Sequence, residues 1–242
     1  MDGMGEGEFR KDVSAVIAPP SATLQFLEAR AGAEYAALLL QLPILRIQAP
    51  RGHGEPVMVL PGFMTDDRST WVLRSFLTSI GYVVAPWDQG LSRGRMMDFL
   101  APTIERVTRL FTAHGTKVRL VGWSRGGTLA REVARDRPDI VDRVITLGSP
   151  VKGGAQATSI ARLVRQQTGL GATEMQQLMR ARNKVPIQVP ITAIYSKSDG
   201  VVAWQACVDD FNPDVTHFVV GGSHSGLGFN AEAYRIVAKA LA

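Results

Sequence analysis

The sequence predicts an α/β fold in which a mostly parallel sheet carries helices on both faces. Short apolar strands alternate with helices along most of the chain, and this alternation is typical of parallel sheets. The strands are apolar without a polar-apolar alternation, as expected for strands that are buried on both sides. With 242 residues, the chain is expected to form one domain.

The first part of the chain is predicted to be a flexible tail followed by a long helix. The tail is acidic and glycine-rich at its start and ends in two prolines. The helix begins at Ser21 or Thr23, either of which is a suitable cap, and ends near Leu42. Arg30 and Glu34 lie at helical spacing, and we expect them to form a solvated face. The helix covers the core or packs against a partner, and the sequence leaves both open.

The predicted domain consists of strands and helices that follow one another to the end of the chain. Strands are predicted at residues 57–60, 81–85, 117–121, 144–147, 191–195 and 215–220. Helices are predicted at residues 69–80, 98–114, 127–135 and 230–241. Residues 151–189 are longer than a simple crossover needs, and helical spacing predicts two short helices there, separated at 169–171. The chain thus divides into a tail at 1–20 and one domain at 21–242.

The sequence GWSRG at residues 122–126 has the form of a nucleophile elbow. An apolar strand precedes it and a helix follows it, and this context separates it from a glycine-rich turn with an incidental serine. The sharp turn strains the serine backbone, and side chains at Gly122 or Gly126 would collide with neighbouring strands. The turn lifts the Ser124 hydroxyl clear of the sheet edge, over the positive end of the helix. Ser124 is therefore the predicted nucleophile.

Ser124, Asp199 and His224 each follow the carboxyl end of a predicted strand, which is where sites lie in open α/β sheets. A serine hydroxyl needs a base to take its proton, and histidine suits that role because its pKa lies near neutral pH. A buried carboxylate then orients the imidazole and stabilises its protonated form. We assign the nucleophile to Ser124, the base to His224 and the orienting acid to Asp199.

Other histidines and acids fit these roles less well. One histidine precedes the first strand, one ends a helix and one lies within a strand; these are His53, His114 and His217. The acids between the last two strands have the character of solvated or capping residues; these are Asp209, Asp210 and Asp214. Asp209 and Asp210 remain alternatives if Asp199 points away from the base.

The tetrahedral intermediate of such a reaction needs an oxyanion hole with two preorganised N–H donors. One is expected from the backbone of Arg125, the residue after the nucleophile. The other is expected from the loop after the first strand, where Gly62 allows the backbone to approach closely. Phe63 is the predicted donor of that loop, and Met64 is the alternative.

Five stretches give the chain a resemblance to the α/β-hydrolase superfamily, particularly to its bacterial serine esterases and lipases. They are LPGF at 60–63, VGWSRGG at 121–127, ITLGSP at 145–150, SDGVV at 198–202 and GSHSGL at 222–227. The chain order serine, aspartate, histidine is also that of the superfamily. Many members have His-Gly where this chain has Pro61 and Gly62. The resemblance covers residues 56–242 and implies an acyl-enzyme mechanism with no cofactor; no metal site is expected either.

In this fold, an insertion such as residues 151–189 usually forms a cap over the pocket. Its apolar residues suit the binding of acyl chains, but for most of them we expect simple packing. The segment is also basic, through Arg162, Arg165, Arg180, Arg182 and Lys184. We expect these side chains to form a solvated face rather than a site for anionic substrates or lipid surfaces.

Composition limits the partners of the protein. The 27 basic and 22 acidic residues give a net charge of +5, without a basic run or an aromatic-interleaved stripe, so we expect no nucleic-acid partner. The single cysteine, Cys207, excludes an intramolecular disulfide and a cysteine-based metal cluster. The chain shows no signal-peptide pattern and no apolar stretch long enough to span a bilayer, so we expect a cytoplasmic protein without stable membrane insertion. A homo-oligomer stays open.

Together these features predict a carboxylic ester hydrolase of the esterase or lipase type. The expected partner is a small-molecule acyl ester of short to medium chain length, cleaved by the triad of Ser124, His224 and Asp199. A thioesterase or an acyltransferase with the same triad is the alternative. A non-catalytic, ligand-binding member of the fold is a further alternative, because a fold does not fix a function.

Overall fold

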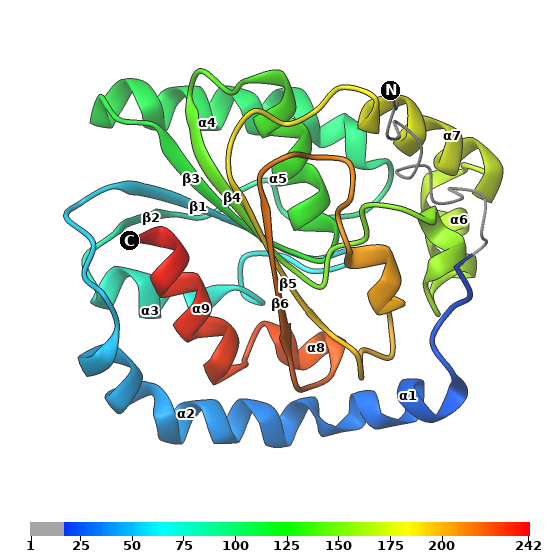
Figure 1. The fold of residues 1–242 in the computed structure, drawn as a ribbon, viewed down its shortest axis with the longest axis horizontal. Helices are drawn as coiled ribbons and strands as arrows, with labels where there is room; N and C mark the ends of the chain where they lie inside the picture. The colour runs from blue at the N-terminus through cyan, green and yellow to red at the C-terminus, as the bar shows by residue number, and fades with distance from the viewer. Residues whose placement is uncertain (1–16) are drawn as a thin grey trace, which may run out of the picture.

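The computed structural model describes residues 17–242, and its centre is a six-stranded sheet (Figure 1). The strands are β1 (Pro56–Leu60), β2 (Val83–Ala85), β3 (Val118–Trp123), β4 (Val141–Leu147), β5 (Ile191–Ser196) and β6 (Val215–Val220). They lie in the order β2-β1-β3-β4-β5-β6, and all neighbouring pairs are parallel. The predicted α/β fold is confirmed, and each predicted strand is present. Residues 1–16 of the predicted tail lie outside the described residues.

Helices cover both faces of the sheet (Figure 1). The layers are formed by α2 (Ala31–Gln48), α3 (Trp71–Ser79) and α9 (Ala231–Leu241) on one face, and by α4 (Leu100–His114) and α5 (Arg125–Asp136) on the other. In β1, Val57 and Val59 pack in the first layer, whereas Met58 and Leu60 pack in the second. Because successive side chains of a strand point to opposite faces, a strand between two helical layers is apolar at every position.

The carboxyl ends of neighbouring strands meet at one edge of the sheet. The register pairs Leu60 of β1 with Gly122 of β3, and Trp123 of β3 with Leu147 of β4. The pairing continues one residue further, since the N–H of Ser124 donates to the carbonyl oxygen of Leu147 at 2.7 Å. The loops that leave these strands therefore begin side by side, and they carry the predicted site residues.

Residues 22–48 form an N-terminal arm that runs along the lower side of the molecule in Figure 1. The arm consists of α1 (Ala22–Phe26), a 3₁₀ turn (Leu27–Arg30) and α2 (Ala31–Gln48). Ser21 caps it, and its side chain accepts a hydrogen bond from the N–H of Leu24 at 3.4 Å. The predicted end near Leu42 is wrong, because the helix continues through Pro43.

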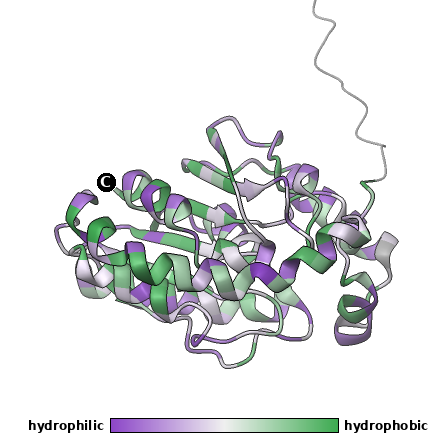
Figure 2. Cartoon of the chain, turned by 90° about the horizontal axis from the view of Figure 1, so that it is seen from below, coloured by the Kyte–Doolittle hydropathy of each residue, from purple (hydrophilic) through white to green (hydrophobic). Residues whose placement is uncertain are grey.

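Packing holds α2 together across its proline. Proline inside a helix costs about 3 kcal/mol or more. Leu38, Leu42 and Leu45 are buried on the inner side of α2, and full burial of one such side chain contributes about 1.5–3 kcal/mol. Three buried leucines therefore offset the cost of Pro43. The outer face of the arm is also apolar, as Figure 2 shows from that side, and its exposed residues include Phe26, Leu40, Ile44 and Ile47.

The insertion at 151–189 contains two helices, as predicted. They are α6 (Ala161–Thr168) and α7 (Ala172–Asn183). Gly169 separates them, and its φ of +67° is a left-handed conformation that favours glycine. Arg182 of α7 pairs with Glu132 and Asp136 of α5. The expected solvated face is therefore wrong for Arg182, because its charge is used to hold α7 against α5.

Among residues 17–242, the structure has no helix that is both long enough and apolar enough to cross a membrane.

Candidate active site

The turn from β3 into α5 places Ser124 in a strained backbone conformation. Its φ of +52° and ψ of −122° lie outside the regions that residues with side chains favour. Among the non-glycine residues that the structure describes, only Met64 and Asp88 share a positive φ. Strain of this kind costs about 1–3 kcal/mol and persists only where the surrounding structure holds it. Here it is held because the strand and the helix are both anchored in the core.

Glycines make room for the elbow. A Cβ at Gly126 would overlap the carbonyl oxygens of Leu60 and Pro61 at the end of β1. A Cβ at Gly122 would overlap the backbone of Gly127 at the start of α5. The expected collision with a neighbouring strand is therefore confirmed for Gly126, whereas a side chain at Gly122 would collide with the start of helix α5 instead.

Asp199 and His224 form a buried hydrogen bond. Nδ1 of His224 lies 2.6 Å from Oδ2 of Asp199, and the two side chains are 8% and 1% exposed. The other carboxylate oxygen accepts the N–H groups of Val201 at 2.8 Å and of Val202 at 2.7 Å. Because Asp199 occupies Nδ1, the neutral imidazole keeps Nε2 as its free proton acceptor.

His224 begins a short helix, α8 (His224–Leu227), which the sequence did not predict. Ser223 caps this helix, and its Oγ accepts the N–H of Gly226 at 2.9 Å. Burial lowers the pKa of His224. The charge of Asp199, its hydrogen bond and the charge of Glu28 outweigh burial, so the pKa is raised above its ordinary value. A raised pKa makes the imidazole a stronger base.

Residues beside Ser124 bring His224 to the elbow. The indole Nε1 of Trp123 donates to the carbonyl oxygen of His224 at 3.2 Å. A Cβ at Gly148, which follows β4, would lie 3.1 Å from Nδ1 of His224 and 3.3 Å from Oδ2 of Asp199. Within residues 17–242, no hydrogen bond joins Oγ of Ser124 to His224. Hydrogen bonds between a nucleophile and its base are often long before substrate binds, so the absence of this bond is compatible with such a pair.

The loop after β1 carries the two N–H groups that the sequence suggested as oxyanion donors, those of Phe63 and Met64. The N–H of Met64 donates to the carbonyl oxygen of Ser92 at 2.8 Å, so this alternative donor is occupied. The N–H of Phe63 has no acceptor among the described residues. The N–H of Arg125 belongs to the first turn of α5, where N–H groups lack a partner inside the helix. Within the described part of the chain, the N–H groups of Phe63 and Arg125 therefore have no acceptor, whereas that of Met64 is occupied.

The side chain of Arg125 joins this loop to its neighbour. Its guanidinium carbon lies 5.4 Å from the ring centres of both Phe63 and Phe99. Its Nη1 donates to the carbonyl oxygen of Gly94 at 2.9 Å. Burial lowers the pKa of Arg125 to about 10, against the opposing charge of Asp98. The side chain is therefore a cation at neutral pH. The sequence had suggested a role only for the backbone N–H of Arg125.

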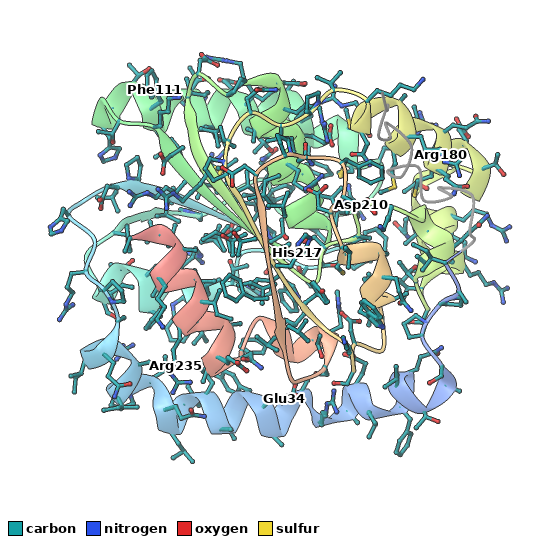
Figure 3. All side chains as sticks on the ribbon, in the orientation of Figure 1. Glu34, Phe111, Arg180, Asp210, His217 and Arg235 are labelled. Carbon is teal, nitrogen blue, oxygen red and sulfur yellow. The ribbon has the colours of Figure 1, made fainter. Side chains whose placement is uncertain are left out.

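The other acids and histidines have different partners. Asp209 makes a buried ion pair with Arg131 of α5, and Asp210 pairs with Lys152 at 2.6 Å nearer the surface (Figure 3). His217 of β6 accepts the N–H of Asp209 at 3.0 Å. Two further histidines are exposed; they are His53 and His114. The fold therefore brings the predicted acid, and not these alternatives, to the predicted base. In the part of the chain that the structure describes, no group of three or more His, Cys, Asp and Glu side chains is arranged to hold a metal ion.

The sequence did not point to Glu28, which lies in the 3₁₀ turn of the arm and accepts the N–H of His224 at 2.7 Å. Arg30 and Glu34 pair at 3.1 Å, as their spacing predicts. They do not form the expected solvated face, because Glu34 accepts the N–H of Ser223 at 2.9 Å and faces the loop that carries the histidine (Figure 3). The sequence did carry one signal for these contacts: Glu28, Arg30 and Glu34 are charged residues within an otherwise apolar segment.

Comparisons with known proteins agree with this architecture. A scan with protein-family models gives no match, and a comparison with curated proteins gives none either. Solved structures do match. The mouse alpha/beta hydrolase domain-containing protein 10 is 16% identical with a TM-score of 0.53, over 81% of this chain and 94% of that chain. Lipase BlEst2 of Bacillus licheniformis is 17% identical with a TM-score of 0.58, over 80% and 94%. The thioesterase domain from the curacin biosynthetic pathway is 16% identical with a TM-score of 0.55, over 79% and 93%. With its parallel sheet and its strand-turn-helix elbow, the chain has the α/β-hydrolase fold.

Proposed function

We propose that the protein is a serine hydrolase that cleaves carboxylic esters through an acyl-enzyme. The observation that carries the proposal is the buried hydrogen bond between Asp199 and His224, next to the strained elbow of Ser124. In this proposal Ser124 is the nucleophile, His224 the base and Asp199 the orienting acid, and each follows a different strand of the sheet. This arrangement is what acyl transfer needs from side chains.

In the first half of the proposed reaction, Oγ of Ser124 attacks the ester carbonyl carbon while Nε2 of His224 takes the hydroxyl proton. The carbonyl oxygen becomes an oxyanion, which the N–H groups of Phe63 and Arg125 stabilise. Asp199 keeps the imidazole oriented and stabilises its cation. The intermediate then expels the alcohol, which receives the proton from Nε2, and the acyl group stays on Ser124.

In the second half, a water molecule attacks the acyl-enzyme. His224 takes a proton from the water, the same two N–H groups stabilise the new oxyanion, and the carboxylic acid leaves as Oγ regains its proton. The net reaction is therefore hydrolysis of the ester to an acid and an alcohol, with the enzyme unchanged.

We further propose short- to medium-chain acyl esters as the substrates. The insertion that is proposed to cap the site is small, since its helices α6 and α7 have 8 and 12 residues. A small cap encloses less apolar surface than a long acyl chain requires. A thioesterase would use the same triad, so acyl thioesters belong in the same test.

The experiment compares hydrolysis of p-nitrophenyl esters of increasing acyl length by the wild type and by Ser124→Ala. We expect the variant to lose activity by about 10⁴- to 10⁶-fold, because removing the nucleophile leaves only the binding contributions. Ser79→Ala, at the end of α3, is the matched control and should keep full activity.

Equal activity of the wild type and Ser124→Ala would exclude the proposal. If acyl thioesters are turned over much faster than oxoesters, the thioesterase alternative replaces it. The length profile of the wild type then reports the depth of the acyl site.

A further inference from the structure

One carboxylate of the N-terminal arm joins the two loops that carry Asp199 and His224. Oε1 of Glu28 accepts the N–H groups of Gly200 at 2.8 Å and of His224 at 2.7 Å. Oε2 accepts the N–H of Ser225 at 3.0 Å. These hydrogen bonds span at least 172 residues of sequence, so only the folded chain makes them.

We propose that Glu28 is a positioning residue, which fixes the acid loop (residues 197–202) against the histidine loop (residues 221–226) so that His224 meets Asp199. The inference rests on the proposed function, because it assigns Glu28 to the same site. Glu28 does not contact the reacting atoms. It acts through the backbone of His224 and through Gly200, the residue that follows Asp199.

The close fit between the arm and both loops is independent support. A Cβ at Gly200 would overlap the carbonyl oxygen of Leu24 and would lie 2.9 Å from the backbone nitrogen of Gln25. A Cβ at Gly226 would overlap the carboxylate of Glu34. Both loops therefore have glycine where the arm lies closest, as a built contact requires.

Two further charged residues extend the contact along the arm. Nη2 of Arg30 donates to the carbonyl oxygen and to Oγ of Ser198, both at 3.0 Å. Glu34 accepts the N–H of Ser223 at 2.9 Å and its hydroxyl at 2.5 Å. The arm thus holds the residues that immediately precede the proposed acid and base, as well as those that follow them.

The charge of Glu28 also acts on the base. Burial raises the pKa of Glu28, but hydrogen bonds from Ser225, His224 and Gly200 outweigh burial, so the pKa is lowered and the side chain is a carboxylate at neutral pH. This charge adds to that of Asp199 in raising the pKa of His224. Two further charged residues of the arm contact these loops, Arg30 at Ser198 and Glu34 at Ser223, and they are paired with each other.

Glu28→Gln tests the inference, because it keeps the size of the side chain while removing its charge and one acceptor oxygen. Glu105→Gln is the matched control, since Glu105 lies on α4 with a side chain that is 70% exposed. We expect kcat on p-nitrophenyl esters to fall about 10- to 100-fold in Glu28→Gln, with KM little changed, as is typical when a supporting residue is lost. The control should match the wild type. Thermal unfolding of both variants checks that they fold.

A pH titration separates positioning from a merely structural role. Removal of the Glu28 charge is expected to lower the pKa of His224 and to move the ascending limb of kcat/KM to lower pH. The chain has four histidines, so the His224 ring signal in proton NMR is assigned by its absence in His224→Asn. Its titration should move in the same direction, and this reading requires no turnover.

The outcomes distinguish the two proposals. A Glu28→Gln variant with wild-type kcat and an unmoved His224 titration overturns the inference while the proposed function stands, even if the variant unfolds at a lower temperature. Ester hydrolysis that persists in Ser124→Ala overturns the proposed function. In that case the NMR titration still decides whether Glu28 acts on His224.

Discussion

His224 lies between two carboxylates whose charges act in the same direction. Asp199 contacts Nδ1 and Glu28 accepts the backbone N–H, and both raise the pKa of the imidazole. In the proposed reaction only the neutral imidazole takes the proton of Ser124, so a raised pKa moves the active form to higher pH. We therefore expect kcat/KM to rise through a limb centred above about pH 6.5, the ordinary pKa of histidine. A pH-rate profile measures this, and a limb centred below that value would contradict the raised pKa.

The hydrogen bond of Asp199 predicts the effect of a single-atom change. Asp199→Asn keeps the shape of the side chain but places an amide group at Nδ1, which favours the wrong tautomer of His224. We expect kcat to fall by about 10³- to 10⁴-fold. Steady-state kinetics on p-nitrophenyl esters measures the loss. A variant within tenfold of the wild type would show that another acid orients the base.

Gly148 offers a steric test of the same pair. It has a φ of +58°, and a Cβ there would lie 2.7 Å from Cδ1 of Leu227 and 3.1 Å from Nδ1 of His224. We expect Gly148→Ala to lower kcat by about 10-fold or more, because small misplacement of reacting groups is costly. Gly115→Ala is the control: its φ is +65°, but no atom lies within 4 Å of the added Cβ. Gly115→Ala should lose about 1–2 kcal/mol of unfolding free energy. Gly148→Ala should lose at least as much because of its close contacts, and only Gly148→Ala should lose kcat.

Some residues of the candidate site could be predicted from the sequence, for a physical reason. Ser124, Asp199 and His224 each follow a strand, and the edge of a parallel sheet gathers such residues whatever the intervening chain does. Glu28 was not accessible, because its partners are backbone N–H groups and these leave no mark on the residue types around them. The hydrogen bond between the N–H of Met64 and Ser92 was not accessible either, because it joins two loops that only the fold brings together.

At the scale of elements, α5 is held by buried charge as well as by apolar packing. Arg131 pairs with Asp209 in the loop between β5 and β6, and both side chains are buried. Breaking a buried pair by removing one partner typically costs about 3–5 kcal/mol, because the remaining charge stays uncompensated. We expect Asp209→Asn to lose unfolding free energy of this order in urea denaturation, while the folded variant keeps the kcat of the proposed reaction. A loss of kcat as large as that of Asp199→Asn would make Asp209 the orienting acid.

The sequence located the elements better than it located their ends. Strand and helix positions followed from apolar patterns that reflect burial in two layers. Two features, the full length of α2 and the presence of α8, were not predicted because tertiary contacts determine them. Helix α2 continues through Pro43 since its leucines are buried against the core, and α8 exists because Ser223 caps a four-residue segment that carries no periodicity of its own.

At the scale of the whole molecule, the arm makes stability depend on pH. The folded-state pKa of Glu28 is lowered, so its stabilisation is present above the unfolded value of about 4.3 and is lost as the pH falls through the folded value. We expect Glu28→Gln to be less stable than the wild type near neutral pH, and the difference to shrink as the pH falls below that unfolded value. Urea unfolding at a series of pH values measures this. A difference that stays constant down to acid pH would show that the charge of Glu28 contributes no stability.

The position of the arm in the sequence determines when its contacts with the two loops can form during synthesis of the chain. Glu28 leaves the ribosome 196 residues ahead of His224. At elongation rates of about 5–20 residues per second, the backbone N–H of His224 emerges roughly 10–40 s after Glu28. Ser124 emerges only about halfway through that interval, and until the interval ends the proposed acid and base have no fixed relation to each other. The proposed hydrolytic site is thus completed when the loops that carry Asp199 and His224 dock onto the arm, which precedes both loops in the sequence.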